Sequence, residues 1–371
     1  MMCGRIEIPD WELIPKLVLL VFRRMAPVFT LPSLAEDPNS MTECLISIWR
    51  LRKIYTVEKA KMTLHDLIME SHAFKASDPR DKVYSIIGLA DDRDKIRLKI
   101  DYSRPIRDLY INVASYMIEH DTDLSLLLSN LHTKSIDLPS WVPDWSTWHF
   151  GSNGAAMSIG YDASGNSKPK VRVRRSQNEL ELSGCIVDSI IRLGSDIGPH
   201  YVGTRNPEVN QRRDSWLKEQ KEMVREAKRV KRSPHRESAS ELLWRTLIGN
   251  ITLDEEKASD DYETLYDAHL QLSNKYISLE DKAMAREFCD AVRRRSRYRR
   301  LATTEKAYFG GVPHTSQVGD WICMFHGSSL LHVIREHGRG YLYIGHAYVH
   351  GLMNGEILKH RYYKKQTIRL V

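Results

Sequence analysis

The C-terminal part of the chain places the tightest limit on the fold. Short apolar runs alternate there with glycine-containing turns. The runs lie at residues 321–325, 331–334, 341–344 and 347–349, and the turns contain Gly327, Gly338, Gly340 and Gly351. Short strands at this spacing are typical of a small antiparallel sheet or barrel. We therefore expect β-structure over about residues 320–371.

The first 150 residues follow a helical pattern instead. Apolar side chains at helical spacing predict helices near residues 13–24, 41–51 and 63–74. Asp78, followed by a proline, is expected to cap a further helix that ends near Gly88. We predict a helical domain over residues 1–150.

Residues 151–371 are predicted to form a second, α+β domain. Alternating apolar residues predict strands over about 171–191. Charged helical patterns then occupy about 212–300, before the C-terminal strands begin. The predicted fold class is therefore α+β, with a mainly helical N-terminal half and then a small antiparallel β-sheet or barrel interrupted by charged helices.

Composition restricts the class of protein. Of 371 residues, 42% are hydrophobic and 28% charged, which is typical of a globular chain. The net charge of +7 is a mild excess that does not by itself indicate a nucleic-acid-binding protein. The sequence contains no apolar run long enough to span a membrane. The five cysteines are scattered, which fits reduced thiols in the cytoplasm, with the nucleus as an alternative.

The common catalytic signatures are missing from the sequence. It has no Gly-x-Ser-x-Gly elbow, no Walker loop, no Gly-x-Gly-x-x-Gly fingerprint and no His-Glu-x-x-His. His346 and His350 stand four residues apart, but two histidines do not make a zinc site. We expect no catalytic residue, no cofactor and no metal.

A run of arginines is the sharpest charge feature. Its members are Arg293, Arg294, Arg295, Arg297, Arg299 and Arg300. One interpretation is a patch that binds nucleic acid or anionic membrane. The other is a solvated helix end, where cations favour the negative end of the helix dipole.

Several segments together resemble fungal heterokaryon incompatibility (HET) domain proteins. The first segment, "DPRDKVY", is followed by "LPSWVPDWS", and the chain closes with a "GDWI" segment and an "AYVHGLMNGE" segment in the order of that family. The motif residues are Asp78, Pro79, Arg80, Asp81, Lys82 and Tyr84, then Trp141, Pro143, Asp144 and Trp145, then Gly319, Asp320, His350, Gly351, Gly355 and Glu356. We interpret them as determinants of the fold.

The resemblance covers the region that follows the HET domain, and the signatures of the HET domain itself are missing from the sequence. It implies a role in recognition between fungal individuals and in programmed cell death, through protein partners. We expect a truncated family member that is not an enzyme and acts in recognition or regulation. Two alternatives remain open: a basic adaptor that uses Arg293 to Arg300, and a hydrolase or NAD-consuming enzyme without a visible motif.

Overall fold

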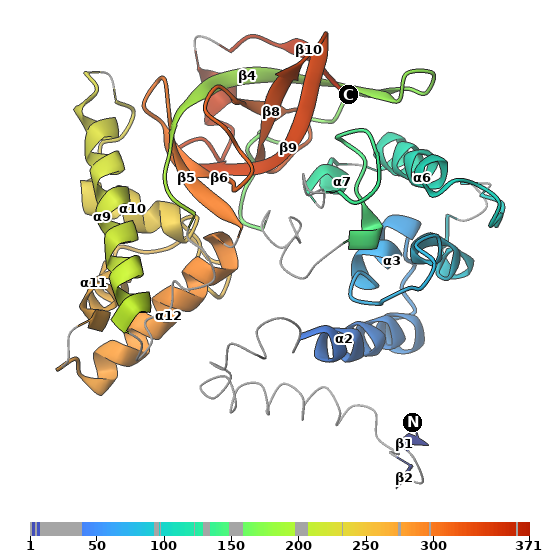
Figure 1. Ribbon diagram of the computed structural model, residues 1–371, viewed down its shortest axis with the longest axis horizontal. Helices are drawn as coiled ribbons and strands as arrows, with labels where there is room; N and C mark the ends of the chain where they lie inside the picture. Colours follow the sequence, from blue (N-terminus) through green and yellow to red (C-terminus); the bar gives the residue numbers. More distant parts are fainter. Residues whose placement is uncertain are drawn as a thin grey trace. The chain divides into compact units, whose positions relative to one another are not determined.

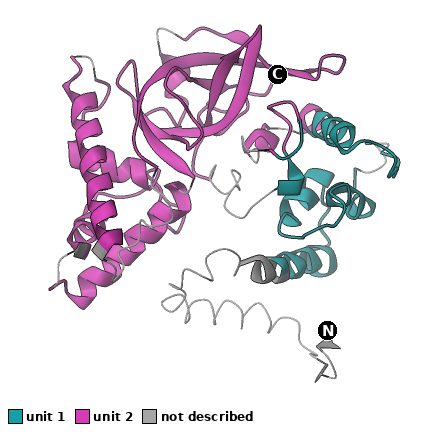
Figure 2. Ribbon diagram, viewed as in Figure 1, with its two compact units in different colours: residues 1–117, 135–137, 144–152 teal, residues 118–134, 138–143, 153–371 magenta. Residues whose placement is uncertain are grey.

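The computed structural model describes most of the chain. The described residues are 2–3, 6–7, 39–92, 96, 98–121, 123–128, 134–147, 159–196, 207–231, 233–273, 276–296, 298–360 and 363–371. The chain divides into two compact units (Figure 2). Unit 1 comprises residues 1–117, 135–137 and 144–152, and unit 2 comprises residues 118–134, 138–143 and 153–371. The predicted domain boundary near residue 150 stays a prediction.

Unit 1 is mainly helical. Its helices are α2 (Asn39–Lys53), the π-helical turn η2 (Ile54–Glu58), α3 (Leu64–Glu70), α4 (Asp81–Tyr84), the 3-10 turn η3 (Ile87–Leu89), most of α6 (Ile106–His120) and the 3-10 turn η4 (Trp145–Thr147). Two short strands, β1 (Met2–Cys3) and β2 (Ile6–Glu7), pair antiparallel. The helices predicted near 41–51 and 63–74 are confirmed as α2 and α3, whereas the one predicted near 13–24 lies outside the described residues.

The cap of α3 explains where that helix begins. Thr63 accepts a hydrogen bond from the backbone N–H of Asp66, and the Asp66 carboxylate accepts one from the backbone N–H of Thr63. This capping box satisfies two donors that the first helical turn leaves unpaired. Leu64 and Leu67 then turn their fully buried side chains into the core.

The helix predicted to begin at Asp78 is wrong in both its cap and its length. Helix α4 has a single turn, and Arg80 occupies the position before its first residue. The Asp78 carboxylate accepts a hydrogen bond from the backbone N–H of Arg80 at 2.9 Å. An aspartate that bonds the backbone two residues ahead forms its own turn, which here delays the helix.

Unit 2 is built on one eight-stranded sheet that closes into a barrel (Figure 1). Its strands are β3 (Val171–Arg174), β4 (Glu179–Leu193), β5 (Arg299–Thr304), β6 (Phe309–Pro313), β7 (Trp321–Phe325), β8 (Leu331–His337), β9 (Gly340–Val349) and β10 (Gln366–Leu370). The path β4–β5–β6–β9–β8–β7 returns to β4, because β4 pairs with both β5 and β7. Strand β10 joins β4 to β9, and β3 adds to β4 outside this path.

Strand β9 departs from the prediction. The runs at 341–344 and 347–349 form one continuous strand. The register with β8 shifts next to Gly345, so the strand bends there and does not end. A Cβ atom at Gly345 would lie 2.8 Å from the Pro313 ring, and glycine therefore allows β6 to approach closely.

The sequence patterns do not predict β5 and β6. Strand β5 opens inside the arginine run, and β6 contains Gly310, Gly311 and Pro313, which weaken a strand pattern. A Cβ at Gly310 would lie 2.2 Å from the Tyr348 carbonyl oxygen. The glycine is thus needed for β6 to pair with β9.

Between β4 and β5 the described residues form four α-helices, and we call residues 207–296 the helical insertion. They are α9 (Pro207–Arg229), α10 (Ala239–Leu247), α11 (Tyr262–Leu270), with the 3-10 turn η5 (Gln271–Ser273), and α12 (Leu279–Ser296). The predicted charged helices are confirmed here, although the last one ends at Ser296. Two short helices complete the unit, α7 (Ser125–Leu128) and the 3-10 turn η6 (Glu356–Lys359).

Two hydrophobic clusters stabilise unit 2. The barrel interior contains Ile190, Ala302, Val312, Ile322, Val333 and Ile344. The other cluster lies in the helical insertion around Trp244 and Phe288, and it includes Leu301 of β5 and Phe309 of β6. The insertion therefore shares its core with two barrel strands.

In the described part of the chain, no helix combines the length and apolar character that crossing a bilayer requires.

Candidate functional site

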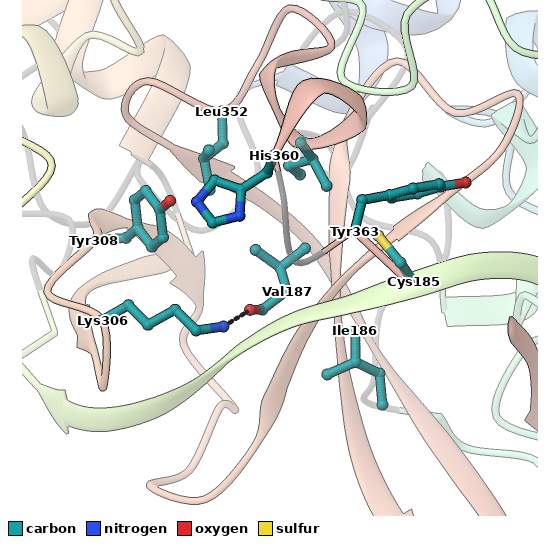
Figure 3. Close-up of a pocket in the computed structure, with 9 residues that line it drawn as sticks. Cys185, Ile186, Val187, Lys306, Tyr308, Leu352, His360 and Tyr363 are labelled. Atoms are coloured by element: carbon teal, nitrogen blue, oxygen red, sulfur yellow. Dashed lines mark hydrogen bonds between the residues drawn. The ribbon is translucent and has the colours of Figure 1, made fainter. Parts of the chain in front are cut away.

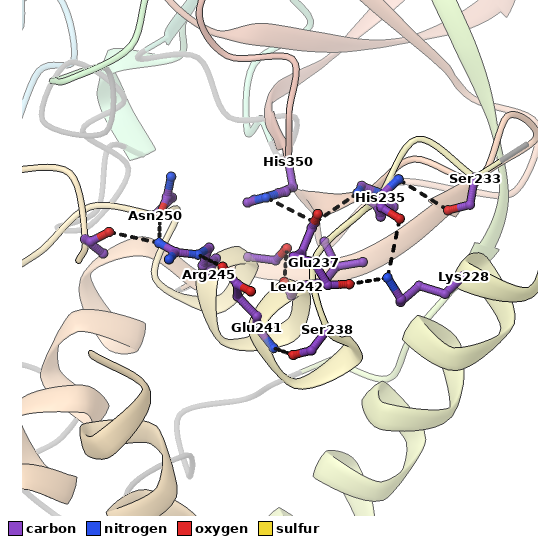
Figure 4. A network of polar contacts seen from close by, with 12 residues as sticks. Lys228, Ser233, His235, Glu237, Ser238, Glu241, Leu242, Arg245, Asn250 and His350 are labelled. Carbon is purple, nitrogen blue, oxygen red and sulfur yellow. Dashed lines mark hydrogen bonds and ion pairs between the residues drawn. The ribbon is translucent and has the colours of Figure 1, made fainter. Parts of the chain in front are cut away.

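Three titratable side chains meet where the helical insertion joins the barrel (Figure 4). His235 and Glu237 lie in the segment between α9 and α10, and His350 follows β9. The Ser238 hydroxyl caps α10 by accepting a hydrogen bond from the backbone N–H of Glu241. The backbone N–H of His350 donates to the carbonyl oxygen of Phe309 at 2.9 Å. Both sides of the cluster are thus held by backbone structure.

Glu237 is the centre of this cluster. Its Oε1 lies 3.3 Å from Nδ1 of His235 and 3.3 Å from Nε2 of His350. Burial opposes the charged form of the carboxyl group, but the hydrogen bond from His235, a backbone N–H and the two nearby imidazoles outweigh it and lower the pKa of Glu237 to about 2. Glu237 is therefore an anion at neutral pH.

His350 is neutral at the same pH. Burial lowers the pKa of His350 to about 4, despite the opposing attraction of Glu237. Its Nδ1 lies 2.9 Å from the Tyr348 hydroxyl. Burial also raises the pKa of Tyr348 well above its ordinary value, so this hydroxyl keeps its proton. The contacts of His350 with Tyr348 and with Glu237 fix the orientation of its ring. They do not provide a reactive nucleophile.

Arg245 extends the network along α10. Its guanidinium donates to Glu241 at 2.9 Å and to the Ala258 carbonyl at 2.8 Å, and it pairs with Asp260. It also lies over the Trp244 ring, 4.3 Å from the ring centroid. These contacts tie α10 to the loop that follows it.

A small pocket opens beside the cluster (Figure 3). Its cavity volume is about 40 Å³, and Tyr308 belongs both to its lining and to the surroundings of His235, at a ring-centroid distance of 6.5 Å. Cys185 also lines the pocket, and burial raises the pKa of its thiol to about 11. Since a thiolate is the nucleophilic form, this cysteine is unreactive at neutral pH.

The motif residues in unit 1 bond to one another and to the backbone. Arg80 pairs with Asp78 at 2.7 Å, and the Tyr102 hydroxyl donates to Asp81 at 2.5 Å. Lys82 donates to the carbonyl oxygens of His72 and Phe74, and Tyr84 donates to that of Asp101. The Tyr110 hydroxyl donates to the Pro79 carbonyl at 2.7 Å. Each contact holds local structure.

The tryptophan motif is also buried. The Trp145 ring packs edge-on against Tyr110 at 4.8 Å, and the Asp144 carboxylate accepts hydrogen bonds from the backbone N–H groups of Ser135 and Ser146. In unit 2, the Trp141 indole donates to the Asn178 carbonyl at 2.9 Å, and Pro143 is buried.

The C-terminal motif residues shape turns of the barrel. Asp320 is 1% exposed and accepts two hydrogen bonds from Arg335, at 2.7 and 2.9 Å. Gly319, Gly351 and Gly355 adopt positive φ angles, which a residue with a side chain rarely takes. The Glu356 carboxylate accepts a hydrogen bond from the backbone N–H of Asn354.

The arginine run does not form one continuous surface patch. Arg293 pairs with Asp290 and Arg294 with Glu255. Arg300 donates to the carbonyl oxygen of Gly194, and Arg297 lies outside the described residues. Arg295 and Arg299 are buried, so the interpretation of the run as a solvated helix end is wrong for these two residues. Arg295 lies on the buried side of α12, and Arg299 opens strand β5.

Sequence reasoning named His350 but missed His235 and Glu237. Both lie in the irregular segment between α9 and α10, where the sequence patterns identify no site motif. His346, considered with His350 as a ligand, accepts a hydrogen bond from Arg299 through its carbonyl oxygen and takes no part in the cluster. Within the described ranges, no group of three or more histidine, cysteine or acidic side chains is arranged to hold a metal ion.

Comparison with known proteins agrees with the resemblance seen in the motifs. Residues 212–368 match the family model of the Het-6 β-barrel domain, so the match includes the candidate cluster, strands β5 to β9 and the first part of β10. The chain is 25% identical over 339 residues to heterokaryon incompatibility protein 6, OR allele, of Neurospora crassa. This alignment covers 76% of the chain and 49% of the relative, so the chain spans about half the length of that relative. No solved structure matches the present chain. The chain is therefore similar to the heterokaryon incompatibility (HET) protein family in its barrel region and across most of its length.

Proposed function

We propose that this chain is a recognition and regulatory region of a fungal heterokaryon incompatibility protein. In this role it distinguishes self from non-self after cells fuse, and it controls a programmed cell death response through protein partners in the cytoplasm. It does not itself catalyse a reaction. The catalytic or toxic step belongs to another domain or protein.

One observation carries the proposal: the titratable groups of the candidate site are engaged with one another inside the protein. Glu237 contacts His235 and His350, and Tyr348 contacts His350. General acid–base catalysis favours a pKa near the working pH, whereas here Glu237 and His350 have pKa values of about 2 and 4. This arrangement supports a rigid binding module rather than a reactive centre.

The alternative of a basic adaptor receives less support. Its six arginines include Arg295 and Arg299, which are buried, and Arg293 and Arg294, which already pair with acidic residues. A polyanion would therefore find few available cations along this run.

The test is genetic. Strains that carry different alleles of the gene are paired, and the recovery of growing heterokaryons is measured before and after the gene is deleted from one strain. Deletion is expected to raise recovery, and restoring the wild-type gene is expected to lower it again. Unchanged recovery after deletion would contradict the proposed role.

A second measurement addresses catalysis. The purified chain is incubated with NAD and with a panel of esters, alongside a His350→Gln variant. We expect no turnover by either protein. Turnover by the wild type that the variant lacks would show that the site is catalytic.

A further inference from the structure

Strand β3 has an open edge. It pairs with β4 from Val171 to Arg174, and it pairs with no other strand in the described part of the chain. The hairpin that it forms with β4 extends from the barrel (Figure 1). An open edge presents main-chain donors and acceptors to which another strand can bind.

The hydrogen-bond register shows which main-chain groups face outward. The backbone N–H of Ser183 donates to the carbonyl oxygen of Lys170 at 3.1 Å. Residues in an antiparallel pair alternate between facing the partner strand and facing away from it. Residues 170, 172 and 174 therefore face β4, and Val171 and Val173 direct their N–H and C=O groups to the open edge.

Basic side chains line this edge on one face. Lys168, Lys170, Arg172 and Arg174 occupy alternate positions, which places them on the same side of an extended chain. Arg174 lies 2.6 Å from Glu181, and Arg369 of β10 lies 3.6 Å from Glu179. The two glutamates are thus matched by two arginines.

Three basic side chains of this face have no acidic partner among the described residues. Lys168, Lys170 and Arg172 are exposed, and none of them forms an ion pair with a described residue. The opposite face of β3 carries Val171, which is half-buried, and Val173, which is buried. The edge therefore offers a row of main-chain groups with positive charge on one side and apolar side chains on the other.

We propose that the open edge of β3 binds an extended acidic segment of a partner protein as an added strand. Main-chain hydrogen bonds to Val171 and Val173 hold the segment in place. Acidic side chains at alternate positions of the segment lie next to Lys168, Lys170 and Arg172, and the apolar side chains between them continue the valine face. Cross-strand charge pairs and apolar pairs then select the partner. The inference rests on the proposed function for its biological role, and the binding itself can be measured separately.

The test uses the full chain and a short fluorescent peptide in which glutamate and valine alternate. Binding is followed by fluorescence anisotropy for the wild type and for a variant with Lys168→Glu, Lys170→Glu and Arg172→Glu. We expect this charge reversal to weaken binding about tenfold or more, because three favourable cross-strand pairs become repulsive. The control variant carries Arg212→Glu, Lys218→Glu and Arg225→Glu, which are exposed positions on α9 with the same change in net charge. It is expected to bind as the wild type does.

A second peptide separates strand addition from simple charge attraction. It has the same sequence but carries N-methyl groups on alternate residues, which remove main-chain donors and keep every charge. We expect its binding to be lost. Equal binding of the two peptides, equal weakening by both triple variants, or tighter binding of a single-stranded oligonucleotide through the same three residues would each overturn the proposal. The triple charge-reversal variant is also introduced into the fungus. If this variant no longer binds the peptide but the strain still shows allele-dependent incompatibility, this inference is overturned and the proposed function stays intact.

Discussion

The two ends of the arginine run, one on helix α12 and the other on barrel strand β5, use arginine in opposite ways. On α12, Arg293 and Arg294 are exposed and pair with the carboxylates of Asp290 and Glu255. A few residues later, Arg299 of β5 is buried and donates to the carbonyl oxygens of Gly311 and His346. One run of like residues thus changes from surface charge to internal support, and the change begins at Arg295, which is buried at the end of α12.

The two regions also differ in how they bury their apolar residues. Helix α12 buries one side, whereas both faces of strands β7 to β9 are covered over most of their length. They are nevertheless joined, since Leu301 and Phe309 of the barrel strands belong to the cluster of the insertion. The difference in architecture therefore does not make the two regions independent.

The largest expected effect tests this junction. Phe309 is fully buried, and Phe309→Ala would leave a cavity between β6 and the insertion. We expect it to lower the free energy of unfolding by about 3–5 kcal/mol. Urea denaturation measures the change, and Leu279→Ala, at an 84% exposed position, serves as the control. Separate transitions for helices and strands in the wild type would contradict a shared core.

The next effect, counted per residue, is a loss of stability in acid. Burial lowers the pKa of His269 in the insertion to about 3, of His332 in the barrel to about 3 and of His350 to about 4. The unfolded chain binds these protons near the ordinary histidine pKa and the folded chain does not, so stability falls as the pH drops below that value. Between pH 7 and pH 5 we expect a loss of about 2 kcal/mol for each histidine.

Urea denaturation at several pH values measures this dependence. The His332→Gln variant is expected to show a shallower dependence on pH, whereas His337→Gln, at an exposed position, is expected to match the wild type. Stability that stays constant from pH 7 to pH 5 would show that the folded and unfolded chains bind protons equally over this range, and that burial does not lower the pKa values of these histidines.

A smaller effect separates the two kinds of arginine. Arg299→Ala would leave the carbonyl oxygens of Gly311 and His346 without their donor. We expect a loss of about 1–3 kcal/mol in the free energy of unfolding. Thermal or urea denaturation of the single variant provides the measurement, and a more stable variant would show that burying this charge costs more than its hydrogen bonds contribute.

The smallest effect is expected on the helix. Arg293 pairs with Asp290 on an exposed surface, where salt and water weaken the attraction. Arg293→Ala should therefore change the free energy of unfolding by less than about 1 kcal/mol. The same denaturation experiment applies, and a loss as large as that of Arg299→Ala would remove the distinction between the two regions.

Much of the fold follows from the sequence, because apolar periodicity records which face of an element is buried. Strands β7 and β8 and helix α2 lie close to where the pattern predicts them. Strands β5 and β6 are not predicted, because an arginine run and two glycines lack the alternating apolar pattern of a strand. These segments form strands by pairing with β4 and β9, which are distant in sequence. The candidate cluster is not predicted for a related reason. His350 and Glu237 are distant in sequence, and only closure of the barrel against the insertion brings them together.

The placement of the insertion has a consequence for how such a protein can change over generations. The helices leave the barrel after β4 and return at β5, and these two strands pair with each other, with Leu193 opposite Ala302. The ends of the excursion are therefore anchored side by side, and lengthening a loop between fixed ends adds little entropic cost. Substitutions on the solvent-facing side of these helices can therefore accumulate while the order of the barrel strands stays the same. A change on the exposed helical surface would then leave the shared core intact, whereas a change among the residues that seal the junction would disturb both the helices and the barrel strands.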